Sequence, residues 1–205
     1  MLYTPASYGE YDHNTTSLNY QNMKHFFITL CAVFFFLGSQ AQSSIKSTDV
    51  LLKEARQQAA KENKKVFVIF HASWCHWCHK LDTAMADASC KPLFDKSYVT
   101  CHLTVLENGD KKSLENPGAM ELLKAHHGDQ QGIPFWLIFD KDGKLVADSQ
   151  IRPEGASLDT QGQNIGYPGS KDEIAAFQKV LRKTSKLSEA EITLIGERFA
   201  ALKGS

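Results

Sequence analysis

The sequence predicts an α/β fold with an added C-terminal helix, because strand-like and helix-like segments alternate along it. The nearly continuous apolar run at residues 66–70 indicates a central strand that is covered on both faces. Residues 98–105 alternate between apolar and polar side chains, as a second strand does. Ser170 and Ser188 are each followed three residues later by a glutamate, which is typical of helix starts.

The remaining elements are predicted from periodicity and from turn residues. A helix opened by Ser47 is expected to run to about Asn63, before the first strand. A helix beginning near His79 is expected to break at 87–89. Further along the chain we expect a short helical piece through 94, a loop at 107–118, a helix at 119–127, a hairpin of strands 135–139 and 144–148, a loop at 150–169, and helices at 170–183 and 188–202. The loop at 150–169 is long enough to be either functional or a disordered insertion.

The composition is that of an ordinary globular protein with no excess charge. The chain has 205 residues, 42% of them apolar, with 23 basic and 23 acidic side chains. The balanced charge gives no electrostatic reason to expect binding to nucleic acid or to an anionic membrane. The length suits one domain with appended segments.

The front of the chain has the layout of a secretory signal peptide at residues 23–41. A lysine and a histidine precede a run at 26–37 that is apolar apart from Thr29, and small residues follow, so we expect cleavage after Ala41. The apolar run is too short to span a bilayer comfortably, and a buried helix is the alternative. Residues 1–22 are polar and aperiodic, and we expect them to be a non-structural extension. The mature protein is therefore expected to be periplasmic or secreted, without stable membrane insertion.

The run Cys75-His76-Trp77-Cys78 lies between the predicted strand and a predicted helix. Two cysteines at this spacing can close a small disulfide, and the N-terminus of a helix favours the thiolate form of the first. That thiolate can attack a partner's disulfide, and the second cysteine can resolve the mixed disulfide. A zinc site is the alternative, but zinc needs four ligands and the chain has no second Cys-x-x-Cys.

Two separated motifs resemble those of the thioredoxin superfamily, in particular exported bacterial thioredoxin-like proteins with Trp-Cys-x-Trp-Cys. They are the runs 70–78, which contains the cysteines, and 132–143, which begins Gly-Ile-Pro. The resemblance implies a thioredoxin fold, with a central mixed β-sheet flanked by helices and an extra C-terminal helix. It places a thioredoxin-like domain at 47–185 and a C-terminal helical extension at 186–205.

The resemblance also implies roles for individual residues. Cys75 matches the nucleophile, Cys78 the resolving cysteine, and Trp74 the aromatic residue that shields the disulfide and contacts substrates. Pro134 matches a proline that follows a cis peptide bond beside the disulfide, where Ile133 would present its backbone to a substrate segment. The alternative for Pro134 is an ordinary trans proline at the start of an edge strand.

One position departs from the family pattern. Many thioredoxins have a buried acid that assists proton transfer to the resolving cysteine, and Ile69 stands there in this chain. Water or another group would then carry the proton, with Glu107 as a candidate. His76 and His79 flank the second cysteine, and a cationic imidazole there would stabilise the Cys75 thiolate and make the disulfide more oxidising. The alternative is two partly exposed polar residues on the first turn of a helix.

Two other functions compete with disulfide exchange. The same cysteines followed by His79 satisfy Cys-x-x-Cys-His, the attachment motif of c-type haem, but neither Met85 nor Met120 is a convincing second axial ligand. A non-catalytic thioredoxin-fold binding module is the other alternative.

The sequence therefore predicts an enzyme, an exported thiol–disulfide oxidoreductase that acts on protein thiols and disulfides and is reset by a redox partner. No metal or organic cofactor is expected. Cys90 and Cys101 permit a structural disulfide, but two separate buried core cysteines are the favoured interpretation.

Overall fold

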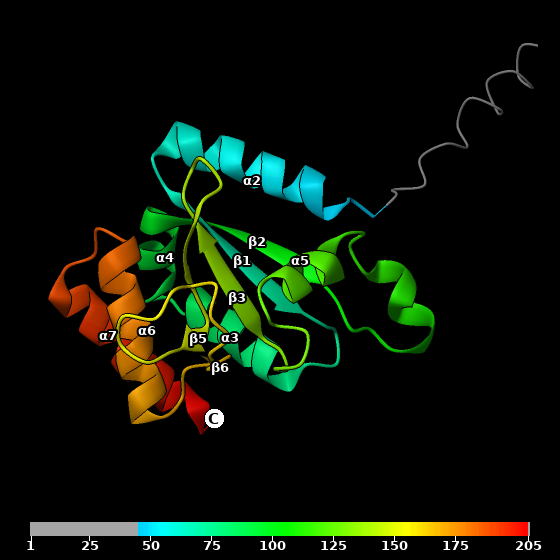
Figure 1. Cartoon of the computed structure of the whole chain (residues 1–205). Coiled ribbons are helices and arrows are strands. Elements are labelled where there is room, and N and C mark those ends of the chain that lie inside the picture. The colour runs from blue at the N-terminus through cyan, green and yellow to red at the C-terminus, as the bar shows by residue number, and fades with distance from the viewer. Residues whose placement is uncertain (1–44, 205) are drawn as a thin grey trace, which may run out of the picture. The chain divides into compact units, whose positions relative to one another are not determined.

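The computed structural model describes residues 45–204, and the order of its elements confirms the predicted α/β pattern (Figure 1). The helices are α2 (Thr48–Glu62), α3 (His76–Ala86), α4 (Lys91–Ser97), the 3₁₀ helix η1 (Gly109–Leu114), α5 (Ala119–Ala125), α6 (Lys171–Thr184) and α7 (Glu189–Lys203). The strands are β1 (Lys65–His71), β2 (Tyr98–Thr104), β3 (Phe135–Phe139), β4 (Leu145–Asp148), β5 (Gln150–Ile151) and β6 (Gln163–Asn164).

The main sheet is mixed, as expected, with strand order β2-β1-β3-β4. Strands β1 and β2 are parallel, with Val68 opposite Cys101, because α3 and α4 carry the chain back along the sheet between them. Strand β3 runs antiparallel to β1, and β4 returns as the second strand of a hairpin. This order puts β1, the strand that leads into the cysteines, in the interior of the sheet.

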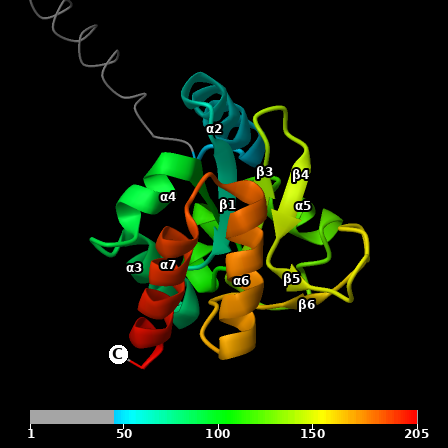
Figure 2. The ribbon, with the colours of Figure 1, turned by 90° about the vertical axis from the view of Figure 1, so that its left-hand side faces the viewer.

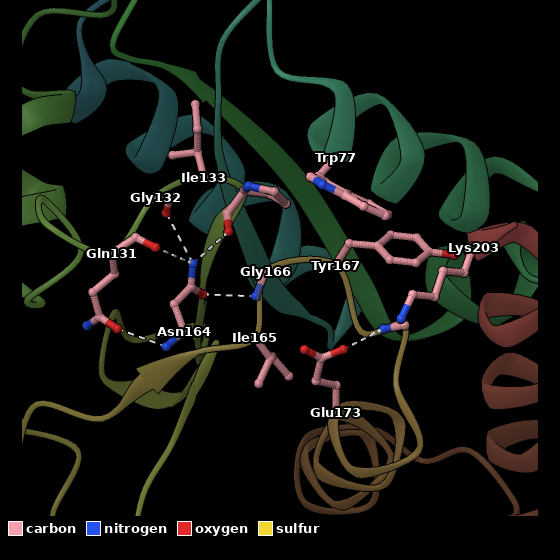
Figure 3. A pocket seen from close by; sticks show the side chains of 12 residues that line it. Trp77, Gln131, Gly132, Ile133, Asn164, Ile165, Gly166, Tyr167, Glu173 and Lys203 are labelled. Carbon is pink, nitrogen blue, oxygen red and sulfur yellow. Dashed lines mark hydrogen bonds between the residues drawn. The ribbon is translucent and has the colours of Figure 1, made fainter.

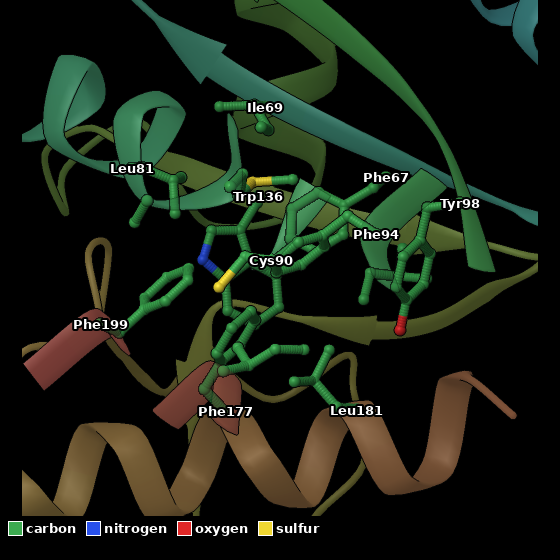
Figure 4. Close-up of a cluster of buried hydrophobic side chains, with 14 of the residues drawn as sticks. Phe67, Ile69, Leu81, Cys90, Phe94, Tyr98, Trp136, Phe177, Leu181 and Phe199 are labelled. Carbon is green, nitrogen blue, oxygen red and sulfur yellow. The ribbon is translucent and has the colours of Figure 1, made fainter. Parts of the chain in front are cut away.

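Two hydrophobic clusters cover the two faces of the sheet, and helices close both. Alternation along β1 sends Phe67 and Ile69 to the face with α6 and α7, and Val66 and Val68 to the face with α2 and α5. The first cluster is rich in aromatic rings, with Trp136 and Phe177 fully buried (Figure 4). Both strand faces are therefore apolar, which explains the continuous hydrophobic run in the sequence.

Helices α6 and α7 lie side by side against the first face (Figure 2). Both begin with the predicted capping box, in which the serine side chain accepts the backbone N–H of the glutamate three residues on. Phe199 of α7 is fully buried among the rings of α4 and α6. The added C-terminal helix thus contributes to the hydrophobic core of the sheet.

Several element boundaries differ from the predictions. Helix α3 starts at His76, three residues before the expected start, because Cys75 itself acts as the N-cap. The loop predicted at 107–118 contains η1. Segment 150–169 contains the short β5–β6 pair, and its Arg152 side chain makes a bidentate, almost fully buried ion pair with Asp148.

Cys90 and Cys101 are separate buried thiols, which confirms the favoured interpretation. They lie in different clusters, Cys90 with the aromatic residues on one face and Cys101 on the opposite face of the sheet. A bond between them would have to pass through the sheet.

The predicted leader at 23–41 and the extension at 1–22 lie outside the described residues. Within residues 45–204, no helix is both long enough and apolar enough to cross a membrane.

Candidate active site

The centre of the candidate site is a disulfide between Cys75 and Cys78 at the N-terminus of α3. The backbone N–H of Cys78 points at Cys75 Sγ, with a nitrogen–sulfur distance of 3.1 Å. The first backbone N–H groups of a helix carry partial positive charge and lack partners within the helix, so they stabilise negative charge on this sulfur. The sequence-based placement of the first cysteine at a helix N-terminus is therefore confirmed.

Little of either sulfur-bearing residue reaches solvent. Cys75 is 3% exposed and Cys78 is 1% exposed, and both pack against Ala72 and Ile133. The flanking Trp74 is by contrast 53% exposed. Its indole N–H donates to the carbonyl of Leu106 at 2.7 Å, so the ring is anchored at one edge while most of it remains available for contact.

The loop before β3 passes directly over the disulfide. The peptide bond between Ile133 and Pro134 is cis, as the resemblance implied. The carbonyl oxygen of Ile133 lies 3.5 Å from Cys75 Sγ. The structure thus brings Cys75, Cys78, Ile133 and Pro134 together although the two motifs are far apart in the sequence.

Asn164 of β6 holds this loop in place. Its side-chain amide donates to the carbonyls of Gly132 and Pro134, each at 3.1 Å, while its Oδ1 accepts the N–H of Gly166 at 3.0 Å (Figure 3). The backbone N–H of Asn164 donates to Gln131 Oε1 at 2.8 Å. Segment 150–169 is therefore packed on the site and supports its proline loop.

A second group of hydrogen bonds fixes the loop between β1 and α3. The Glu107 carboxylate accepts hydrogen bonds from the backbone N–H and the hydroxyl of Ser73, at 2.6 and 2.8 Å. The Ser73 N–H holds the pKa of Glu107 below its ordinary value of 4.5. Both carboxylate oxygens are used in these bonds, and the suggested role of Glu107 in proton transfer stays a prediction. Glu107 anchors the loop that precedes the cysteines.

The histidines beside the cysteines contact groups other than the sulfurs. His79 Nε2 lies 3.0 Å from the carbonyl oxygen of Ser73, and the His76 ring contacts the edge of Trp77. In residues 45–204 neither imidazole hydrogen-bonds to a sulfur, so their effect on the Cys75 thiolate stays a prediction. Ile69 is fully buried opposite Trp136 and provides no proton acceptor beneath the disulfide.

These residues do not fit a c-type haem. Both sulfurs are used in the disulfide, they are enclosed by Ala72 and Ile133, and His79 faces a backbone carbonyl. Met85 is buried in the core on the same helix. Among the described residues, no group of three or more histidine, cysteine, aspartate or glutamate side chains is arranged to hold a metal ion.

A family model described as thioredoxin-like matches residues 48–141, which include α2, the cysteine pair, the cis-proline and β3. Residues 48–141 form a thioredoxin-like domain. This segment contains β1, β2 and β3 of the mixed sheet, and β4, α6 and α7 follow it.

Solved structures of thioredoxin-like proteins are weakly similar to this one. A disulphide isomerase from Xylella fastidiosa Temecula1 is 20% identical, with 80% of this chain and 95% of that chain covered and a TM-score of 0.41. A thioredoxin from Thermus thermophilus is 19% identical, with 68% of this chain and 85% of that chain covered and a TM-score of 0.39. No curated protein matches the sequence. The family assignment depends on the matched segment and not on these similarities.

Sequence reasoning missed the supporting residues of this thioredoxin-like site. Asn164, Gln131 and Ser73 act through side-chain or backbone contacts with residues about 30 positions away. Tyr167, whose ring lies against that of Trp77 beside the cysteines, was missed because it lies in a segment without periodicity. The only signal for it was the unusual length of the 150–169 connection, which is typical of functional loops.

Proposed function

We propose that this protein is an exported thiol–disulfide oxidoreductase that exchanges disulfides with protein substrates through Cys75 and Cys78. The observation that carries the proposal is the disulfide at the N-terminus of α3 with the Ile133 carbonyl 3.5 Å from Cys75 Sγ. A bond in this position combines a stabilised leaving thiolate with a backbone surface for an incoming chain.

Exchange from the oxidised pair proceeds in two displacements. A substrate thiolate attacks Cys75 Sγ, the bond to Cys78 breaks, and Cys78 leaves with the electron pair and takes a proton from water. A second substrate thiolate then attacks the substrate sulfur of the mixed disulfide, and Cys75 leaves as a thiolate at the helix N-terminus. Two electrons pass from the substrate to the pair. The reverse sequence reduces a substrate disulfide.

The residues around the two sulfurs have separate roles in binding the substrate. Because Cys75 is almost fully buried, a substrate sulfur reaches it only when the substrate chain contacts the rim formed by Trp74 and the proline loop. Ile133 offers a backbone carbonyl and Pro134 fixes the path of the loop. A protein dithiol or disulfide is needed as a redox partner that returns the pair to its starting state.

Trapping tests the two cysteine roles. Cys78→Ser should accumulate mixed disulfides with client proteins through Cys75, while Cys75→Ser should not. Turnover of a protein disulfide such as that of insulin should be present in the wild type and absent in both variants. Equal trapping by both variants would contradict the assigned roles, and a folded wild type without turnover would indicate a binding module.

Export is supported by the signal-like residues 23–41. Expression of the full chain in a Gram-negative host, followed by fractionation and mass measurement, tests it. We expect a periplasmic product whose mass corresponds to a chain beginning at Gln42. An uncleaved product in the cytoplasm would refute export without touching the exchange chemistry.

A further inference from the structure

A pocket adjoins the proline loop, and Trp74 is not among the residues that line it. It has a volume of about 260 Å³, and its wall includes Ile133, Pro134, Trp77 and Tyr167 (Figure 3). Ile133 is shared with the surroundings of Cys75. A chain bound over the disulfide therefore passes the mouth of this pocket.

Aromatic rings form one side of the pocket and are held in place from behind. The rings of Trp77 and Tyr167 lie 5.6 Å apart, and Tyr167 stacks on Phe199 of α7 at 5.6 Å. The Tyr167 hydroxyl donates to the carbonyl of Phe199 at 2.6 Å, which fixes the ring. Trp77 is 43% exposed, so part of its face is open to a further ring or aliphatic group.

The polar groups of the pocket are already used within the protein. The Asn164 amide is bonded to backbone groups, and Gln131 Nε2 donates to His127 and Gln150. The Glu173 carboxylate accepts the N–H groups of Gly169 and Ser170 as part of the cap of α6. A charged ligand would find few free hydrogen-bond partners here, whereas an apolar group gives up no hydrogen bonds with water when it enters the pocket.

Lys203, a cation that lines the pocket, is also held in place by the fold. The aliphatic stem of Lys203 runs along Gly169, where an added Cβ would come within 2.8 Å of Lys203 Cδ. Burial raises the pKa of Glu173, but the backbone N–H groups of Ser170 and Gly169, with a smaller contribution from the charge of Lys203, hold it below its usual value. The pair leaves the pocket without a net charge to be matched.

The volume of the pocket favours one side chain over a whole small molecule as its occupant. Small-molecule sites usually have volumes of about 300–1,000 Å³, and this pocket, at about 260 Å³, is smaller. We propose that it binds one large apolar side chain, preferably aromatic, of the substrate segment that carries the reacting cysteine. This rests on the proposed function and adds a preference for substrates with an aromatic residue near the cysteine.

Synthetic peptides test the preference. Each peptide carries one cysteine as a mixed disulfide with a coloured thiol, and phenylalanine, alanine, aspartate or lysine two positions before or after it. Reduced protein should release the coloured thiol with a kcat/KM about ten-fold higher for a phenylalanine peptide than for its alanine counterpart. Trp77→Ala should reduce this ratio to within about two-fold. Leu194→Ala, an exposed apolar residue elsewhere on α7, is the matched control and should keep the ratio.

A binding measurement avoids any effect of Trp77 on the redox pair. The Cys75→Ser/Cys78→Ser protein is titrated with the phenylalanine peptide in which serine replaces cysteine, and indole N–H signals are followed by NMR. We expect the Trp77 signal to move and the alanine peptide to leave it unchanged. Movement of Trp74 alone, or equal rates with all peptides, would overturn the pocket assignment while exchange itself stands. No release from any peptide would instead contradict the proposed function.

Discussion

The hydrogen bonds of Asn164 to the proline loop lead to a quantitative prediction. Asn164→Ala removes the donor to the carbonyls of Gly132 and Pro134 and the acceptor for the Gly166 N–H. The loop then keeps its apolar contacts but loses its polar support on the β6 side. We expect both lower stability and slower disulfide exchange, because Ile133 is part of this loop.

The size of the loss follows from the three hydrogen bonds, which are 3.0–3.1 Å long. A typical hydrogen bond contributes roughly 0.5–1.5 kcal/mol to stability. Asn164 is only half-buried, so water can reach some of the freed groups, and the lower part of the range applies. We expect the free energy of unfolding to fall by about 2 kcal/mol, which at a urea m-value of about 2 kcal/mol/M moves the midpoint by about 1 M.

Urea unfolding of the oxidised protein, followed by fluorescence, gives the stability, and peptide exchange gives kcat/KM. Exchange should slow by about ten-fold because the backbone at Ile133 is less well positioned. Asn108→Ala is the control, since the Asn108 side chain makes no capping bond where it precedes η1. A variant with wild-type stability and wild-type exchange would show that the loop does not depend on Asn164.

Three further outcomes follow from buried or paired groups. Because the native pKa of Glu107 is lowered, its stabilisation is present above the unfolded value of about 4.5 and is lost as pH falls through the native pKa, so Glu107→Gln should flatten the acid limb of a Tm–pH curve. Arg152→Met should lower the free energy of unfolding, measured in urea, by about 3–5 kcal/mol, because it leaves the Asp148 carboxylate buried without its partner. Adding Asp148→Leu should restore part of this loss. Thiol counting on the oxidised protein without residues 1–41, and so without Cys31, should give two free thiols after denaturation and slow labelling before it, because burial raises the pKa of Cys101 to about 11 and also that of Cys90.

Each of these outcomes has a contrary result. A Tm–pH curve of Glu107→Gln that parallels the wild type would mean that the carboxylate does not anchor the loop. An Arg152→Met protein as stable as the wild type would mean that the ion pair adds nothing to segment 150–169. An absence of free thiols in the denatured protein would show a second disulfide.

The main strands and helices of this protein could be predicted because they depend on residues that are close together in the sequence. The apolar run of β1 needs cover on both faces, and the sheet provides it. The capping box at Ser170 and the N-cap at Ser188 were predicted correctly because their partners lie within one turn. The start of α3 was missed because a cysteine sulfur, which is rarely counted as a cap, accepts the N–H of Cys78.

The support of the site was harder to predict because it depends on contacts between distant segments. Glu107 reaches Ser73 and Asn164 reaches Pro134, and neither pair shares a repeat or a spacing that a sequence pattern reveals. Segment 150–169 has no hydrophobic period, so its sequence alone did not distinguish a disordered insertion from a structural element. Its order comes from Arg152, which binds Asp148 and backbone carbonyls of the same segment.

The position of Lys203 at the edge of the pocket has a practical consequence for work with the purified protein. Helix α7 ends there, at Lys203. An affinity tag fused directly after α7 would start beside the surface where we expect substrates to bind, and an enlarged or charged segment there would compete with them. An affinity tag placed ahead of α2 is therefore the safer choice for rate measurements, and a change in peptide preference after removal of a tag that follows α7 would itself report on the pocket.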